Sequence, residues 1–205
     1  MSKVMLVANR ATSIKKEKDF HYIGVDGGAL LLSEQNITMD YAIGDFDSVG
    51  DKRRAELEKI TTIEQLPVRK NESDSEYAIK FALERYDEVY ITGVSGGRLD
   101  HFLSVYHMLA FQEYHFTIVD EQNHISKLEQ GTHHIQKHKK YLSLFAVCES
   151  EITITGVEYP LYDRKLNLHD IYTLSNEIID TEAILEIKKG TLIVIQSADK
   201  KNTLD

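Results

Sequence analysis

Short apolar runs alternate with longer stretches of helical spacing over residues 1–120 of the chain. Short runs bounded by turn residues are typical of buried strands, whereas apolar residues three and four positions apart are typical of amphipathic helices. The pattern predicts strands at 4–8, 22–25, 41–43, 62–66, 88–92 and 115–119, and helices at 29–34, 52–60, 75–86 and 99–111. Strands that alternate with helices favour a mainly parallel sheet with helices on its faces.

The last third of the chain has a different pattern. Residues 151–155 alternate strictly between polar and apolar side chains, which is typical of a half-buried strand. Further strands are predicted at 141–147, 183–187 and 192–195, with glycines between the runs and little helical periodicity. We therefore predict an α/β domain over residues 1–123 and an all-β sandwich domain over residues 124–205.

Two aspartates separated by one residue follow the apolar run at 41–43, in the segment Gly44-Asp45-Phe46-Asp47. Alternate side chains of an extended backbone point to the same face, so we expect both carboxylates on one side, with Cα atoms roughly 7 Å apart. Two converging carboxylates favour a hard divalent cation such as Mg²⁺ between them. The alternative is a solvated acidic turn, because aspartate and glycine are ordinary turn residues.

A glycine pair follows the second predicted strand, in the segment Asp26-Gly27-Gly28. Glycines let a ligand approach the backbone closely, and the N-terminus of the next helix presents free N–H groups to an anion. The segment is therefore a candidate for nucleotide binding. An ordinary turn between a strand and a helix explains it equally well.

A polar segment precedes the helix predicted from residue 75. Ser73 and Glu76 have the spacing of a capping box, which needs no ligand. Lys70 and Asp74 are left to be explained, although aspartate is also common in a first helical turn.

A third loop is rich in glycine and precedes the helix predicted at 99–111. It contains Ser95, Gly96 and Gly97, and the residues that open the helix include Arg98, Asp100 and His101. Backbone N–H groups and an arginine suit phosphate oxygens. The loop lacks both the P-loop pattern and the dinucleotide-binding glycine pattern, and a flexible turn is the alternative.

These polar segments all lie at predicted strand ends or helix starts. In a parallel sheet, ligands gather at the carboxyl ends of the strands, so we expect the segments to meet. Several carboxylates, glycine-rich turns, one arginine and one lysine are what Mg²⁺-assisted phosphoryl chemistry requires.

Composition narrows the classes of partner. The net charge is −9 and no basic stripe is visible, which argues against nucleic-acid binding. No apolar run approaches the ~20 residues needed to cross a bilayer, so we expect no membrane partner. The chain has 1 cysteine, and Lys15 and Lys16 interrupt the apolar start, so we expect a protein of the reducing cytoplasm without a signal peptide.

Several motifs occur together in an order that is specific to one family. They are Asp26-Gly27-Gly28-Ala29, Gly44-Asp45-Phe46-Asp47-Ser48, Gly96-Gly97-Arg98-Leu99-Asp100-His101, Tyr159-Pro160-Leu161 and Ser175-Asn176-Glu177. Through them the chain resembles the bacterial thiamine pyrophosphokinases (thiamine diphosphokinases) over nearly its whole length. The resemblance implies an N-terminal α/β domain and a C-terminal β-sandwich. It also implies conversion of ATP and thiamine to AMP and thiamine diphosphate with Mg²⁺, in a homodimer that holds the vitamin between its subunits.

The resemblance also implies roles for particular residues. The metal would be held by Asp45, Asp47, Asp74 and Asp100, and the catalytic residues would be Asp47, Asp74, Arg98 and Asp100. ATP would be bound by Asp26, Gly27, Gly28, Lys70, Ser95, Gly96, Gly97, Arg98 and His101. Thiamine would contact Asp100, Ser175 and Asn176.

The chain departs from the family pattern at several positions. Asn71 replaces the first aspartate of the usual Lys-Asp-x-Thr-Asp motif, and Asn9-Arg10 stands where the opening strand usually ends in glycines. Residues 169–174 contain none of the glycines that are common before the Ser-Asn pair.

Two other functions remain open at the level of sequence. One is a phosphotransferase of the haloacid-dehalogenase type, whose nucleophile motif is similar to residues 45–49 but normally follows the first strand. The other is a regulatory module that binds a nucleotide without catalysis.

Overall fold

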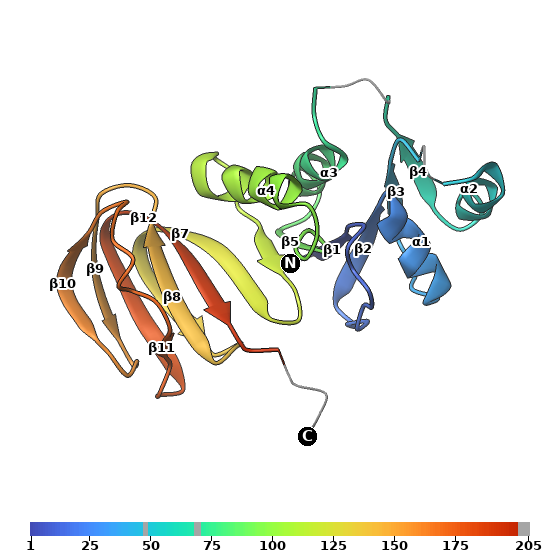
Figure 1. Ribbon diagram of the computed structural model, residues 1–205. Coiled ribbons are helices and arrows are strands. Elements are labelled where there is room, and N and C mark those ends of the chain that lie inside the picture. Colours follow the sequence, from blue (N-terminus) through green and yellow to red (C-terminus); the bar gives the residue numbers. More distant parts are fainter. Residues whose placement is uncertain (47–48, 68–70, 201–205) are drawn as a thin grey trace. The chain divides into compact units, whose positions relative to one another are not determined.

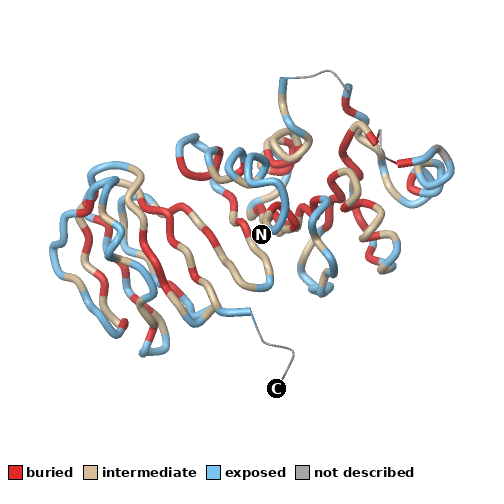
Figure 2. Tube along the Cα trace, in the orientation of Figure 1, coloured by how far each residue is buried: buried red, intermediate tan, exposed pale blue. Residues whose placement is uncertain are grey.

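The computed structural model describes residues 1–46, 49–67 and 71–200 of the chain (Figure 1). It divides into two compact units, Met1–Met108 with Glu113–Ile118, and Leu109–Gln112 with Val119–Asp205. Figure 2 shows that buried residues run along the strands of each unit, which places a separate core in each. Among the described residues, no helix combines the length and the apolar character needed to cross a membrane.

The first unit is built on a parallel sheet with the strand order β6-β5-β1-β2-β3-β4. The strands are β1 (Lys3–Val7), β2 (Phe20–Val25), β3 (Tyr41–Gly44), β4 (Thr62–Gln65), β5 (Glu88–Thr92) and β6 (Thr117–Val119). The helices are α1 (Gly27–Glu34), α2 (Asp51–Leu57), α3 (Asp74–Leu83) and α4 (Leu99–Phe111). The predicted alternation of strands and helices is therefore confirmed in this unit.

The order of strands in this sheet fixes where a ligand can bind. From β1 the chain continues through β2, β3 and β4 toward one edge, whereas β5 and β6 extend the sheet from the other side of β1. The loops that leave the carboxyl ends of β1 and β5 consequently diverge. A crevice forms at such a switch point in open α/β sheets.

Helix α3 illustrates how local sequence starts an element beside this crevice. Ser73 is its N-cap, and the Ser73 Oγ accepts a hydrogen bond of 3.1 Å from the backbone N–H of Glu76. The Glu76 carboxylate pairs with Lys80 at 2.8 Å. The predicted serine cap is confirmed, and such a cap stabilises a helix by about 1 kcal/mol.

The second unit consists of antiparallel strands around two long ones, β7 (Asn123–Gln136) and β12 (Glu182–Ser197), which pair along their lengths. The first half of β12 also pairs with β9 (Ser150–Thr155), and its second half pairs with β8 (Tyr141–Ala146). Strand β10 (Leu161–Leu166) extends β9, and β11 (Asn176–Glu177) extends β8. The predicted class, an α/β region followed by a β-sandwich region, is confirmed.

The two strands predicted at 183–187 and 192–195 are in fact one strand, β12. Its register with β7 shifts between Ile187 and Thr191, at a bulge that contains Gly190. Gly190 has a φ of 96°, and a Cβ atom there would lie 2.2 Å from the Ser150 Oγ. The glycine therefore bends the strand between its two partners without ending it.

Candidate active site

Three aspartates from separate segments meet at the carboxyl end of the parallel sheet. Asp26 follows β2, Asp45 follows β3, and Asp74 is the first residue of α3. Each offers one carboxylate oxygen, and these oxygens all lie within 4.8 Å of one another. We call Asp26, Asp45 and Asp74 the acidic cluster. An all-oxygen donor set of this kind suits a hard divalent cation such as Mg²⁺.

The position of Asp26 depends on the neighbouring strand. Its backbone N–H donates a hydrogen bond of 2.9 Å to the carbonyl of Ile43 in β3. Asp26 has a φ of 49°, which is uncommon for a residue other than glycine. A Cβ atom on Gly44 would lie 2.0 Å from the Asp26 Oδ1, so the carboxylate occupies space that only a glycine leaves open.

The backbone beyond Asp45 differs from the prediction. Strand β3 ends at Gly44, and Phe46 has a φ of 54°, so the expected extended backbone from Asp45 to Asp47 is wrong at Phe46. Phe46 is only 4% exposed, and it packs into the core of the first unit. Burial of this ring at the cost of an unfavourable φ accounts for the turn. Asp47 and Ser48 lie outside the described residues, as does Lys70.

A polar pocket of about 510 Å³ lies at the switch point of the sheet. Its lining comes from the carboxyl end of β2, from the loops after β1, β2 and β5, and from the N-terminal halves of α3 and α4. The lining residues are Ala8, Asn9, Arg10, Val25, Asp26, Ser73, Asp74, Ser75, Gly93, Val94, Arg98, His101 and Val105. The pocket thus brings two members of the acidic cluster together with two guanidinium groups and an imidazole.

Other residues predicted to bind ATP adjoin lining residues of this pocket in the sequence but are not part of the lining. Gly27 and Gly28 open α1 directly after Asp26, and Gly28 is buried. Ser95, Gly96 and Gly97 form the loop between β5 and α4, and both Gly96 and Gly97 are exposed. Their predicted contacts with nucleotide stay predictions.

Asp100 lies apart from the acidic cluster. It accepts two hydrogen bonds from the Arg98 guanidinium, of 3.1 Å from Nε and 2.5 Å from Nη2. These bonds lower the pKa of the Asp100 carboxyl to about 2. The structure brings Asp100 to Arg98 instead of to Asp26, Asp45 and Asp74, so its metal role stays a prediction.

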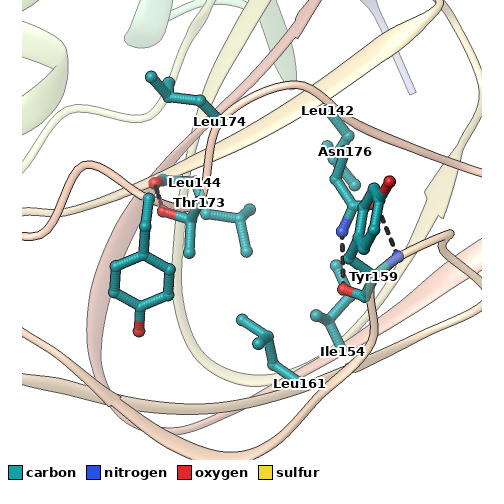
Figure 3. A pocket seen from close by; sticks show the side chains of 9 residues that line it. Leu142, Leu144, Ile154, Tyr159, Leu161, Thr173, Leu174 and Asn176 are labelled. Atoms are coloured by element: carbon teal, nitrogen blue, oxygen red, sulfur yellow. Dashed lines mark hydrogen bonds between the residues drawn. The ribbon is translucent and has the colours of Figure 1, made fainter.

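The second unit has an apolar pocket of about 250 Å³ (Figure 3). It is lined by Leu142, Leu144, Ile154, Tyr159, Leu161, Tyr172, Thr173, Leu174 and Asn176. We call it the apolar pocket.

The Ser-Asn pair has one residue in the apolar pocket. The Asn176 Oδ1 accepts a hydrogen bond of 3.0 Å from the Tyr159 N–H, and its Nδ2 donates one of 2.8 Å to the Tyr159 carbonyl. Asn176 therefore fixes the backbone at the pocket rim. Ser175 is exposed, has a φ of 56°, and donates its N–H to the Ser143 Oγ at 3.0 Å.

Comparison with known families decides what these sites belong to. The family model for the catalytic domain of thiamin pyrophosphokinase matches residues 12–119, and the model for its vitamin B1 binding domain matches residues 132–192. A thiamine pyrophosphokinase from Bacillus subtilis (strain 168) is 34% identical over 187 residues, which cover 87% of this chain and 87% of that protein. This chain belongs to the thiamine pyrophosphokinase family. The family and the enzyme class expected from the sequence motifs are thereby confirmed.

Solved structures of thiamine pyrophosphokinases share this fold. A family protein from Enterococcus faecalis is 29% identical with a TM-score of 0.86, and covers 97% of this chain and 100% of its own. The enzyme from Bacillus subtilis is 30% identical with a TM-score of 0.83 and the same coverage. The enzyme from Candida albicans, at 16% identity, shows the fold alone, with a TM-score of 0.77 over 96% of this chain and 89% of its own.

The sequence motifs did not identify every residue of the site. Asp26 was predicted to bind ATP but not to join a metal-binding group, and neither Asn9 nor Arg10 was assigned a role. Both of these last residues follow β1, whose carboxyl end is an edge of the polar pocket. The signal that could have found them is the strand order, because it makes β1 and β5 neighbours.

Proposed function

We propose that the protein transfers the diphosphate group of ATP to the hydroxyl of thiamine at the acidic cluster, giving thiamine diphosphate and AMP. The observation that carries this proposal is the meeting of three carboxylates within 4.8 Å beside a polar pocket at the switch point of the sheet. Membership of the thiamine pyrophosphokinase family supports the choice of substrates.

The acidic cluster is the site that we propose for Mg²⁺. Asp26, Asp45 and Asp74 would hold the ion through carboxylate oxygens, the ligand type that Mg²⁺ prefers. When bound, the ion would neutralise charge on the phosphate oxygens during transfer. Asp47 and Lys70, which the family motifs also implicate, lie outside the described residues and stay part of the proposal.

The chain's own residues would orient the triphosphate and accept a proton. In the transfer, the thiamine hydroxyl oxygen bonds to the β-phosphorus, the bond from that phosphorus to the bridging oxygen of the α-phosphate breaks, and the hydroxyl proton must leave. Asp100 is the proposed acceptor. While Arg98 holds it, the Asp100 carboxyl has a pKa of about 2 and accepts protons poorly. Asp100 becomes a better base when Arg98 turns from it to a phosphate oxygen.

The apolar pocket is the proposed place for part of thiamine. Apolar walls with few polar groups are typical of small-molecule sites, and here Thr173 and Asn176 supply those groups. The match of residues 132–192 to a vitamin B1 binding domain supports this assignment. We expect Ser175 to contact the vitamin as well.

We also propose a homodimer. Several large apolar side chains are exposed along residues 159–174, including Tyr159 and Ile171 at 69% each and Tyr162 at 68%. Exposed apolar groups gathered in one region are typical of interaction surfaces. A cytoplasmic location stays a prediction, which the single cysteine supports.

The two alternative functions are not favoured. The aspartates that are similar to a dehalogenase-type nucleophile motif follow β3 rather than β1. A non-catalytic module does not need three converging carboxylates, and the family matches are to enzymes.

The product distribution tests the proposal directly. The protein is incubated with ATP, MgCl₂ and thiamine, and nucleotides are separated by chromatography. We expect AMP and thiamine diphosphate in equal amounts, dependent on both thiamine and the metal. Release of ADP and thiamine monophosphate, or of a phosphorylated enzyme, would instead support the phosphotransferase alternative.

A variant of the apolar pocket tests the thiamine assignment. Replacement Asn176→Ala removes both hydrogen bonds to the Tyr159 backbone, so we expect the KM for thiamine to rise about tenfold, or ~1.4 kcal/mol, with the KM for ATP unchanged. Glu186→Ala is the control, since Glu186 is an exposed residue of β12 in the same unit that neither lines the pocket nor belongs to the exposed apolar region at 159–174. An unchanged KM for thiamine in Asn176→Ala would refute this assignment.

A further inference from the structure

Arg10 lies at the switch point and reaches across to the loop of the neighbouring strand. It follows β1, and its backbone N–H donates a hydrogen bond of 2.9 Å to the Gly93 carbonyl just after β5. A Cβ atom on Gly97 would lie 2.5 Å from the Arg10 Nε and 3.0 Å from its Cζ. The Arg10 guanidinium therefore rests against the glycine-rich loop, and it lines the polar pocket.

The two guanidinium groups of the polar pocket have different surroundings. Arg98 is held by Asp100 through two hydrogen bonds. Over the described ranges of the chain, no carboxylate pairs with the Arg10 guanidinium, and its side chain is exposed toward the pocket. Arg10 is therefore a cation that does not have to leave a protein partner before it binds an anion.

A positive charge such as that of Arg10 would offset the negative charges that gather when a triphosphate binds beside the acidic cluster. The acidic cluster contributes three carboxylates, and a nucleoside triphosphate adds several further negative charges. One divalent ion does not neutralise both. A planar guanidinium supplies a fixed positive charge and paired N–H donors that match phosphate oxygens.

We propose that Arg10 is a phosphate-binding residue that contacts the triphosphate of the nucleotide in the polar pocket, in addition to Arg98. The inference rests on the proposed function, because it takes the polar pocket as the nucleotide site. Nothing in the family motifs leads to it, since glycines usually stand where this chain has Asn9 and Arg10. Arg10 would then be a feature of nucleotide binding at a position where this chain departs from the usual family pattern.

Equilibrium binding tests this role without relying on catalysis. The probe is α,β-methylene-ATP, whose bridge between the α- and β-phosphates cannot be cleaved, and its Kd is measured by isothermal titration calorimetry with MgCl₂ and again with EDTA. We expect Arg10→Ala to raise the Kd at least ~10-fold in both conditions, and Arg10→Lys to recover part of the loss, because lysine keeps the charge but not the paired donors.

Adenosine separates a phosphate contact from a structural role. An Arg10 that contacts phosphate leaves the affinity for adenosine unchanged on replacement by alanine, whereas an Arg10 that only supports the glycine-rich loop weakens adenosine and triphosphate equally. The matched control is Arg53→Ala, which removes the same charge from an exposed position of α2 outside the polar pocket. We expect its Kd values to equal those of the unmodified protein.

The possible results distinguish the two proposals. Unchanged triphosphate affinity in Arg10→Ala, or an equal loss for adenosine, overturns the role of Arg10 while the proposed function stands if the unmodified protein still forms AMP from ATP and thiamine. Failure of the unmodified protein to bind the triphosphate at all overturns both. A loss restricted to the triphosphate supports both.

Discussion

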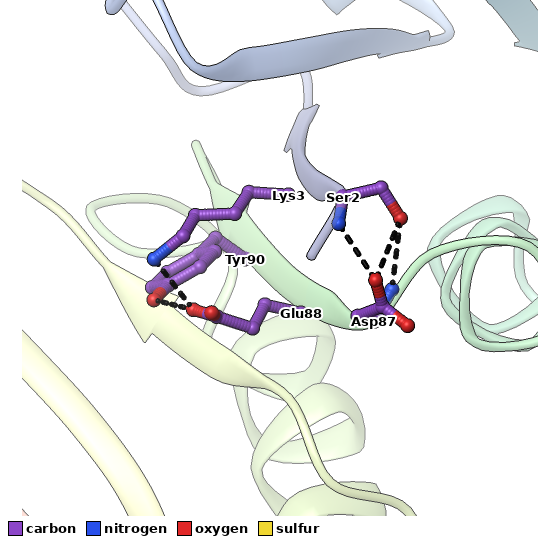
Figure 4. Close-up of polar contacts among 5 residues, drawn as sticks. All are labelled: Ser2, Lys3, Asp87, Glu88 and Tyr90. Atoms are coloured by element: carbon purple, nitrogen blue, oxygen red, sulfur yellow. Dashed lines mark hydrogen bonds and ion pairs between the residues drawn. The ribbon is translucent and has the colours of Figure 1, made fainter.

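The two ends of the parallel sheet use acidic residues in opposite ways. At the amino ends of β1 and β5, carboxylates lie beside donors and cations (Figure 4). The Asp87 carboxylate accepts a hydrogen bond of 2.7 Å from the Ser2 N–H, and Glu88 lies 3.0 Å from the Lys3 ammonium and accepts one of 2.8 Å from the Tyr90 hydroxyl. At the carboxyl ends, three carboxylates gather within 4.8 Å of one another.

The pKa shifts of the groups at the amino ends of β1 and β5 show that these groups are paired. The hydrogen bonds from Ser2 lower the pKa of the Asp87 carboxyl, and the contact with Lys3 lowers that of Glu88. Burial, together with Glu88, raises the pKa of Tyr90 to about 12. Paired groups of this kind favour the folded state, whereas like charges brought together oppose it and are typical of binding sites. One end of the sheet therefore contributes to stability, and the other is the end at which we propose the chemistry.

The largest effect is expected from the acidic cluster. Replacement Asp74→Asn keeps the shape of the side chain but removes one charge from the cluster. We expect AMP formation to fall ~10³-fold or more, about 4 kcal/mol of barrier, because one of the proposed metal ligands is lost. The melting temperature should stay the same or rise, because repulsion among the carboxylates is relieved. Steady-state kinetics and thermal unfolding of the same sample measure both quantities.

The matched replacement at the amino end is Asp87→Asn. It removes the negative charge that strengthens the Ser2 hydrogen bonds, at the opposite end of the sheet from the acidic cluster. We expect a small loss of stability and AMP formation within a factor of about two of the unmodified protein. Comparable losses of activity in the two variants would remove the distinction between the two ends.

The next largest effect, on stability and metal binding, is expected at Gly44, which packs against the Asp26 carboxylate. Replacement Gly44→Ala puts a Cβ atom 2.0 Å from the Asp26 Oδ1, so the carboxylate has to move. We expect a loss of about 2–3 kcal/mol in the free energy of unfolding, typical of overpacking, and weaker binding of Mn²⁺. Chemical denaturation and metal titration measure these effects.

Gly50→Ala is the control, because an added Cβ there meets no atom within 4 Å. Its unfolding free energy should change by less than about 1 kcal/mol, with metal binding unaffected. Equal behaviour of the two glycine variants would mean that Gly44 does not position Asp26.

The smallest effect is expected from the ion pair at the amino end. Because Lys3 and Glu88 are each about a third exposed, at 36% and 34%, solvent screens them, and Glu88→Gln should cost only about 0.5 kcal/mol at neutral pH. The folded-state pKa of Glu88 is depressed, so its contribution is present above the ordinary value of 4.5 and is lost as pH falls through the folded pKa. The gap in stability between the two proteins should therefore close in acid. A gap that widens below pH 4.5 would contradict this assignment.

Local patterns predicted much of the first unit. The 3.6-residue spacing gave α4 with the bounds Leu99–Phe111, and Ser73 with Glu76 marked the start of α3. These features are set by residues close together in sequence. By contrast, β10 was not predicted, because most of its side chains are exposed and show no alternation.

The acidic cluster was predicted only in part. That carboxylates meet at strand ends follows from the parallel sheet, but the choice of Asp26 in place of Asp100 does not. The Asp26 side chain reaches the cluster through a positive φ and the space over Gly44, which belongs to another strand. Asp100 is instead held by Arg98, two residues away. A contact between strands decided the position of Asp26, and no local pattern carries that information, whereas a contact within two residues decided that of Asp100.

A crystal grown with MnCl₂ and α,β-methylene-ATP would show whether the acidic cluster binds the metal beside the nucleotide, because manganese can be located by its anomalous scattering. We expect a manganese peak within coordination distance of carboxylate oxygens from Asp26, Asp45 and Asp74, with the triphosphate in the polar pocket. A well-occupied nucleotide whose manganese ions contact none of these three aspartates would contradict it.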